Sequence, residues 1–243
     1  MTTPCDRCPL RRSSAFHPFS ESELAFMRRF KVGELKIEPG TPILMEGSNA
    51  PQLYTVLQGM GLRYKLLESG GRQVVNFVFP GDFLGLQAGV MDEMGHSVEA
   101  TTSMTLCVFD RKNLWQLFRE QPERAYDLTW LAAIEEHFLG EGLLTIGQRS
   151  ALEAVGWALL RLSERAEALG LMRDGRIPLP FRQQDLADAL GLSVVHTNKT
   201  LKKLRERQLA GWTNGVLQIP DRDKLAEAVG ADRGDGRMAR PLF

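Results

Sequence analysis

The segment that decides the fold of this chain reads Gln184-Asp185-Leu186-Ala187-Asp188-Ala189-Leu190-Gly191-Leu192-Ser193. Its apolar spacing predicts a helix that closes on Gly191. Ser193 is a residue type that begins a helix by accepting a hydrogen bond from the first turn. Two helices joined by so short a turn, the second over 194–208, form a helix-turn-helix. Its expected small core comprises Leu186, Ala187, Leu190, Leu192, Val194, Leu201 and Leu204.

The segments on either side complete this unit. Asn214-Gly215 stands between alternating apolar residues in 211–220, which is a strong signal for a hairpin. That hairpin is expected to be a wing. Residues 170–180 contain Asp174-Gly175 and two prolines and are expected to be a loop, which follows a helix over 152–169.

The charge of the second helix points to DNA. The chain holds 30 basic and 30 acidic residues. Residues 1–150 have 15 basic and 18 acidic groups and residues 151–243 have 15 and 12, so the halves carry −3 and +3. Within 194–210 the basic residues outnumber Glu206, the single acidic one. A local basic helix in a neutral protein is the footprint that a DNA-binding element leaves.

Composition excludes several other classes of protein. With 43% hydrophobic and 25% charged residues the chain has a globular composition, and collagen, simple disorder and disulfide-dense miniproteins are excluded. No apolar run is long enough for a membrane helix, and no secretory pattern opens the chain. A cytoplasmic protein with no membrane partner is expected.

The first half of the chain has the pattern of a β-structure. Residues 32–110 form short apolar or alternating runs separated by turn signals such as Pro39-Gly40 and Pro80-Gly81. The runs at 53–57 and 74–79 have the length and the β-branched content of strands. An antiparallel β-roll or barrel with glycine corners is expected.

Between these parts, residues 121–149 have almost no helix breakers. Apolar residues recur with helical spacing, so we expect one long amphipathic helix that dimerises. The expected dimer stripe is Leu128, Leu131, Ile134 and Phe138. The alternative is a helix packed wholly on its own domain.

The predicted fold class is therefore α+β, with five parts in order. They are a cysteine-containing segment (1–20), a β-roll sensor domain (21–120), a dimerisation helix (121–149), a winged helix-turn-helix domain (150–229) and a flexible tail (230–243).

This order of parts resembles the Crp/Fnr superfamily of bacterial transcription regulators over essentially the whole chain. The specific matches are Pro80-Gly81-Asp82-Phe83-Leu84-Gly85 and the segment 184–193. The resemblance implies a cyclic-nucleotide-binding-like roll and a homodimer on a pseudo-palindromic site in double-stranded DNA. It also implies contact with RNA polymerase through exposed loops, for which Gly89–Gly95 is the candidate.

The resemblance also assigns the residues that contact DNA. The family reads bases with Glu, Ser and Arg at the positions of Val195, Asn198 and Lys199, with His196 between them. Asn198 can bond adenine, Lys199 can donate to guanine, and Val195 can only contact apolar groups such as a thymine methyl. Lys202 and Lys203 are expected on phosphates. The alternative is a solvated helix face.

Cyclic AMP is not the expected effector. Family members that bind it place a Gly-Glu pair and an Arg-Ser/Thr pair in the roll, but here the pairs are Gly85-Leu86 and His96-Ser97. Without the guanidinium, a cyclic phosphate loses its bidentate bonds.

The three cysteines suggest another cofactor. Oxygen-sensing members of the superfamily hold a [4Fe-4S] cluster, and the resemblance places its ligands at Cys5, Cys8, Cys107 and Ser14. Serine is a weaker ligand for iron than cysteine, and Asp6 or His17 are nearby substitutes. Alternatively Cys107 is an ordinary core residue, and Cys5 and Cys8 are a zinc or redox pair or have no role.

Two further hypotheses complete the prediction. One is a regulator without a bound effector, controlled by its abundance or by thiol redox. The other is an enzyme, which we do not expect, because no P-loop, Gly-x-Ser-x-Gly or His-Glu-x-x-His motif is present and the four histidines have no ligand spacing.

Overall fold

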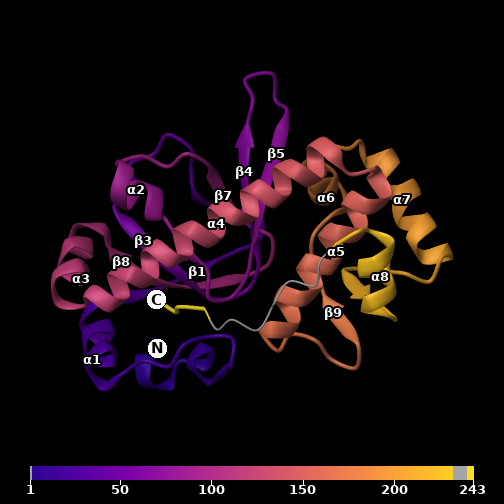
Figure 1. Ribbon diagram of the computed structural model, residues 1–243. Coiled ribbons are helices and arrows are strands. Elements are labelled where there is room, and N and C mark those ends of the chain that lie inside the picture. Colours follow the sequence, from indigo (N-terminus) through magenta and orange to yellow (C-terminus); the bar gives the residue numbers. More distant parts are fainter. Residues whose placement is uncertain (1, 232–239) are drawn as a thin grey trace. The chain divides into compact units, whose positions relative to one another are not determined.

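The computed structural model describes residues 2–231 and 240–243 (Figure 1). Their contacts divide them into two compact units. One unit lies within residues 1–65, 76–136 and 239–243, and the other within 66–75 and 137–238. Among the described helices, none is both long and apolar enough to cross a membrane.

The elements follow one another in the expected order. The helices are α1 (Glu21–Phe30), α2 (Leu86–Met91), α3 (Leu114–Glu120), α4 (Pro122–Gln148), α5 (Ala151–Ala168), α6 (Gln183–Leu190), α7 (Val194–Glu206) and α8 (Arg222–Ala228). The strands are β1 (Lys31–Ile37), β2 (Pro42–Leu44), β3 (Gln52–Gln58), β4 (Gly61–Leu66), β5 (Arg72–Val78), β6 (Phe83–Leu84), β7 (Ser97–Ala100), β8 (Met104–Asp110), β9 (Arg176–Pro178), β10 (Gly211–Thr213) and β11 (Val216–Gln218).

The first unit contains a roll made of two four-stranded sheets. Their strand orders are β1-β8-β3-β6 and β2-β7-β4-β5, and the pairs β1–β8, β3–β8 and β4–β7 are antiparallel. Val56, Val98 and Leu106 are completely buried in its core. Gly81 is required at its corner, since its φ is +88° and a Cβ there would lie 2.1 Å from the Phe16 ring. The expected α+β fold with an amino-terminal roll is confirmed.

The long helix is also confirmed, because α4 spans Pro122–Gln148. Its apolar residues do not all have the expected role. Leu128 and Leu131 are buried within their own protomer, with exposed fractions of 2% and 6%, so they are not free to face a twin. Phe138 is half-buried and stacks on Trp157, with 6.2 Å between ring centroids. Of the expected stripe, only Ile134 is exposed.

The second unit contains the winged helix-turn-helix. Gly191 ends α6 in the left-handed conformation, and the Ser193 hydroxyl accepts a hydrogen bond from the His196 amide at 3.2 Å. β10 and β11 form the expected hairpin around Asn214 and Gly215, which both have positive φ.

The expectation for residues 170–180 is wrong in part. Arg176–Pro178 forms β9, which pairs with β11 and widens the wing to three strands. A strand of three residues that ends on a proline has too little pattern to be found in the sequence, and only its pairing with the wing defines it.

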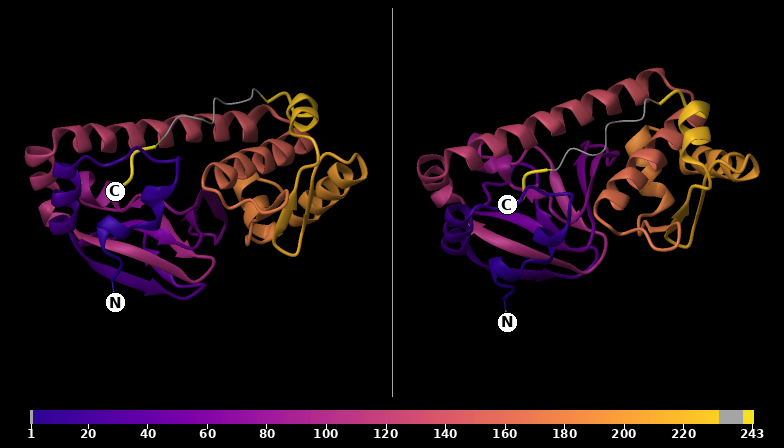
Figure 2. Two further views of the ribbon diagram at one scale, coloured as in Figure 1. Left: turned by 90° about the horizontal axis from the view of Figure 1, so that it is seen from below. Right: turned by 60° about the horizontal axis from the view of Figure 1, so that its bottom comes forward.

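The tail over 230–243 lies mostly outside the described residues. Its last four residues, 240–243, are described and belong to the unit that contains the roll. In Figure 2 this end of the chain lies beside the amino-terminal segment. This packing differs from the expected flexible tail.

Candidate nucleic-acid interface and the sensor roll

One face of α7 is available to a partner, and the other is buried. Thr197, Thr200, Leu201 and Leu204 form the buried face. The predicted DNA-contacting residues Val195, His196, Asn198, Lys199, Lys202 and Lys203 are all exposed, and Val195 is 59% exposed although it is apolar. Val195, Asn198, Lys199 and Lys202 stand at helical spacing and therefore share one face. The predicted base-contacting residues Val195, Asn198 and Lys199 therefore lie on the same exposed face of α7 as Lys202, the predicted phosphate contact.

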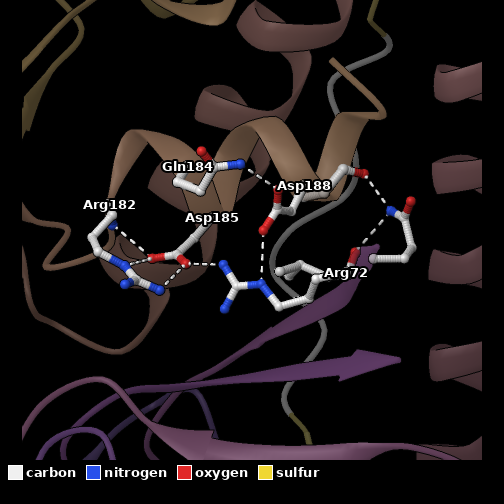
Figure 3. Close-up of polar contacts among 8 residues, drawn as sticks. Arg72, Arg182, Gln184, Asp185 and Asp188 are labelled. Atoms are coloured by element: carbon white, nitrogen blue, oxygen red, sulfur yellow. Dashed lines mark hydrogen bonds and ion pairs between the residues drawn. The ribbon is translucent and has the colours of Figure 1, made fainter. Parts of the chain in front are cut away.

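The preceding helix α6 is held by an ion-pair cluster around the buried carboxylate of Asp185 (Figure 3). Asp185 has no exposed surface and caps the helix by accepting from the Arg182 amide at 2.8 Å. The guanidinium groups of Arg182 and Arg72 reach the same carboxylate, at 2.8 and 2.5 Å. Arg72 also pairs with Asp188 at 2.7 Å. This cluster fixes the helix against which α7 packs.

Arg72 comes from the tip of the β4–β5 hairpin, which groups with the winged helix-turn-helix in the second unit. Its neighbour Gln73 donates from Nε2 to the Ala189 carbonyl at 3.1 Å. Burial by itself raises the pKa of Asp185, but the hydrogen bonds from Arg182 and Arg72 outweigh it and leave that pKa below its ordinary value. Asp185 is therefore a carboxylate, as the cluster requires.

In the roll, charged side chains pair with one another around His96. This is the position at which the resemblance expects a phosphate-binding arginine. Glu135 of α4 pairs with Arg63 at 3.1 Å and accepts from Asn76 Nδ2 at 2.8 Å. Arg63 also donates to the Phe83 carbonyl at 3.1 Å. The guanidinium and the carboxylate therefore neutralise each other inside the roll, so they are not free for a ligand.

His96 occupies the phosphate-binding position itself and is uncharged. Burial and then the nearby charge of Arg63 lower its pKa to about 4. A neutral imidazole gives a cyclic phosphate no charge-assisted bond. That cyclic AMP is not bound in the usual way stays a prediction.

The three cysteines lie around one cavity. Cys5 comes from the 3₁₀ turn Cys5–Arg7, Cys8 follows that turn, and Cys107 lies on the central strand β8 opposite Glu34 of β1. The cavity has a volume of about 30 Å³. Its other lining residues are mostly apolar, namely Thr3, Phe19, Met27, Lys31, Leu57, Phe109, Leu242 and Phe243. We name it the thiol cavity.

The residues of the thiol cavity do not fit a [4Fe-4S] cluster. A volume of about 30 Å³ holds a water or two but not the eight atoms of the cluster. Ser14 is exposed, and neither Ser14, Asp6 nor His17 lines the cavity, so no fourth ligand is present there. Within 2–231 and 240–243, no group of three or more His, Cys, Asp or Glu side chains is placed to hold a metal ion.

Burial sets the ionisation of the thiols that line the cavity. It raises the pKa of the Cys107 thiol to about 11, although Lys31 acts against this, and it also raises the pKa of Cys5. The Nζ of Lys31 donates hydrogen bonds of 2.7 Å to the Thr3 carbonyl and to Glu34 Oε1.

Sequence reasoning missed several residues of these sites. Arg63, Glu135 and Arg72 have no local pattern, because the side chains with which they pair are 59 or more residues away. Leu242 and Phe243 carry a weak local signal, since two large apolar residues after a polar stretch expose apolar surface unless they are buried.

Comparison with known proteins agrees with this arrangement. The model of the cyclic nucleotide-binding domain matches residues 34–121, and that of the Crp-like helix-turn-helix domain matches residues 153–228. The nitrogen fixation regulation protein FixK of Bradyrhizobium diazoefficiens is 31% identical over 229 residues, which are 93% of this chain and 94% of the relative. The chain belongs to the Crp/Fnr family. As a Crp/Fnr-type protein it is a DNA-binding transcription regulator and not an enzyme.

Other Crp/Fnr proteins are similar along the same length. FixK of Rhizobium meliloti is 36% identical over 174 residues, 71% of this chain and 75% of the relative. The transcriptional activator protein FnrL of Cereibacter sphaeroides is 25% identical over 237 residues, 96% and 94% of the two chains. The structure of FixK2 from Bradyrhizobium japonicum has a TM-score of 0.73 at 26% identity and covers 80% of this chain and 95% of its own.

Proposed function

We propose that this protein is a homodimeric regulator that reads a pseudo-palindromic DNA site with α7 and needs no bound small-molecule effector. The observation that carries the proposal is the exposed stripe Val195, Asn198, Lys199 and Lys202 on a helix whose opposite face is buried. A helix that is buried on one face and exposes polar and basic side chains on the other can enter the major groove of DNA.

An exposed apolar stripe on α4 supports the dimer. Leu139, Leu143 and Ile146 follow one another at helical spacing and are 50%, 74% and 44% exposed. A second copy would cover this stripe, and two symmetric readers match two half-sites one helical turn apart. The dimer seam is therefore proposed at Leu139, Leu143 and Ile146, which lie about three turns further along α4 than Leu128 and Leu131.

Control without an effector is supported by the roll. The pair Arg63–Glu135 and neutral His96 occupy the region where an effector would bind, and the thiol cavity lacks the room and the fourth ligand for a cluster. Control by abundance, or by the redox state of the thiols, is the form of regulation that remains. Protein purified without air should be colourless and should bind its operator; brown protein with iron and sulfide would instead support cluster sensing by Cys5, Cys8 and Cys107.

Contact with RNA polymerase is proposed for the end of α2. Val90 and Met91 are 66% and 72% exposed within the segment 89–95. Exposed apolar side chains at such a position are typical of protein interfaces.

The experiment that tests DNA reading begins with selection of the preferred site from random duplexes. Asn198→Ala should then relax specificity at one base position by about 1–3 kcal/mol, because an amide can make a bidentate bond to one base. Lys202→Ala should weaken selected and random duplexes equally and reduce the salt slope by about one unit. Lys112→Ala, which removes an exposed lysine of the roll, is the matched control. Equal losses on both kinds of duplex for Asn198→Ala would refute base reading.

A further inference from the structure

The segment 240–243 is packed into the unit that contains the roll, and its last three residues are buried. Pro241, Leu242 and Phe243 are all buried, with 2% exposure for Leu242 and 5% for Phe243. The ring of Phe243 lies against Phe83 of β6, with 5.3 Å between centroids. The apolar end of the chain is thus inserted into the unit that contains the roll.

The backbone of this segment is bound by two main-chain hydrogen bonds to the amino-terminal segment. The Arg240 amide donates to the Ala15 carbonyl at 2.7 Å, and the His17 amide donates to the Arg240 carbonyl at 2.9 Å. These bonds form a parallel bridge between Arg240 and Phe16. Main-chain pairing of this kind gives affinity to peptide-binding sites, while side-chain pockets give specificity.

Two buried charged groups of the roll unit complete the site. Arg124 is 2% exposed, and its Nη1 donates to the Leu242 carbonyl at 3.1 Å. Glu23 and Asp127 pair with Arg124 at 2.7 and 3.1 Å, so the guanidinium is held in place. At the other end, the Arg240 guanidinium lies 3.4 Å from Asp82, which is 1% exposed.

The same tail residues form a wall of the thiol cavity. Leu242 and Phe243 line it together with Cys5, Cys8 and Cys107. Cys107 itself is 8% exposed. Removing the tail would therefore open the cavity on the side where Leu242 and Phe243 now stand.

We propose that the roll unit carries a peptide-binding site for the chain's own segment Arg240–Phe243, and that this segment seals the thiol cavity. The ligand chemistry is an apolar Leu-Phe end preceded by an arginine. An oxidant, an alkylating reagent or a metal ion reaches Cys107 only when the segment leaves its site.

The test measures alkylation of Cys107 by iodoacetamide in the full chain, followed by mass spectrometry of the peptide that contains it. Leu242→Asp, and deletion of residues 240–243, should speed this reaction at least about tenfold, because the thiol would no longer depend on rare undocking. Leu67→Asp is the matched control, since Leu67 is 70% exposed and should leave the rate unchanged. An unchanged rate in the deletion variant would overturn the proposal.

A synthetic peptide of residues 236–243 separates loss of the seal from general unfolding. Added to the deletion variant, it should bind and restore the slow alkylation, whereas a peptide of the same composition in scrambled order should not. A peptide that neither binds nor protects would count against the site.

The unaltered protein offers an independent measurement. A carboxypeptidase should release Phe243 at least about tenfold more slowly from the folded protein than from the free peptide, because cleavage must wait for undocking. Equal rates would show that the end of the chain is not docked and would overturn the proposal.

Discussion

The winged helix-turn-helix and the roll use charge in opposite ways. On α7, Lys199, Lys202 and Lys203 are exposed to solvent, where a polyanion can displace their counterions. In the roll unit, Arg63 and Arg124 are turned inward and neutralised by Glu135, Glu23 and Asp127. Basic side chains are therefore available to an external partner in one region and are paired with buried or partly buried carboxylates in the other. This difference is what the proposed function predicts, with DNA bound at α7 and no charged effector bound in the roll.

The winged helix-turn-helix also contains a buried charge, Asp185. Its replacement should give the largest effect on stability. Asp185→Ala leaves Arg72 and Arg182 without their shared carboxylate and removes the cap of α6. It should lower the free energy of unfolding by about 3–5 kcal/mol, as when one partner of a buried pair is deleted. Urea unfolding followed by the fluorescence of Trp157 and Trp212 measures it.

A matched control and a pH dependence sharpen this prediction. Asp188→Ala removes the outer partner of Arg72 and should cost about 1 kcal/mol or less. Because the pKa of Asp185 is lowered in the fold, its contribution is present above its unfolded pKa of about 4 and is lost as the pH falls through the folded value. Asp185→Asn should therefore flatten the acid side of the stability profile. A cost for Asp185→Ala no greater than that of Asp188→Ala would contradict the buried cluster.

The exposed apolar stripe of α4 provides the second prediction. Leu143→Glu places a charge in each copy at the proposed seam and should weaken the dimer by about 3 kcal/mol through lost apolar burial and a desolvated carboxylate. Sedimentation over a range of concentrations measures the dissociation constant. Val90→Glu, an exposed apolar residue on α2, is the control. If Leu143→Glu dimerises as tightly as the unaltered chain, the seam lies elsewhere.

His96 should give the smallest of the three effects. Its folded pKa of about 4 lies below the unfolded value of about 6.5, so its contribution to stability is complete above pH 6.5 and is lost as the pH falls towards 4. The shift of the pKa corresponds to about 3 kcal/mol before solvent screening, and because the ring is partly exposed to solvent, His96→Gln should remove about 2 kcal/mol of that acid sensitivity. An NMR titration of the His96 ring checks the pKa directly, and a midpoint near 6.5 would show that the roll is open to water at this position.

The local parts of the fold could be predicted because their causes are local. Gly191 and Ser193 end and begin helices through their own backbone and side chain, and Asn214-Gly215 sets a hairpin by its own φ values. The exposed stripe of α7 follows from helical periodicity alone. These features need no knowledge of distant residues.

The sequence by itself thus determined the order of the elements, the helix-turn-helix and the face of α7 that carries the predicted DNA contacts. Only the tertiary structure decided that Leu128 and Leu131 are buried. It also decided the ion pairs of Arg63 with Glu135 and of Arg72 with Asp185, and the cavity that Phe243 and Cys107 both line. The physical reason is sequence separation. These contacts join residues far apart in the chain. Their favourable free energy is gained only after the intervening elements have folded and lost conformational entropy.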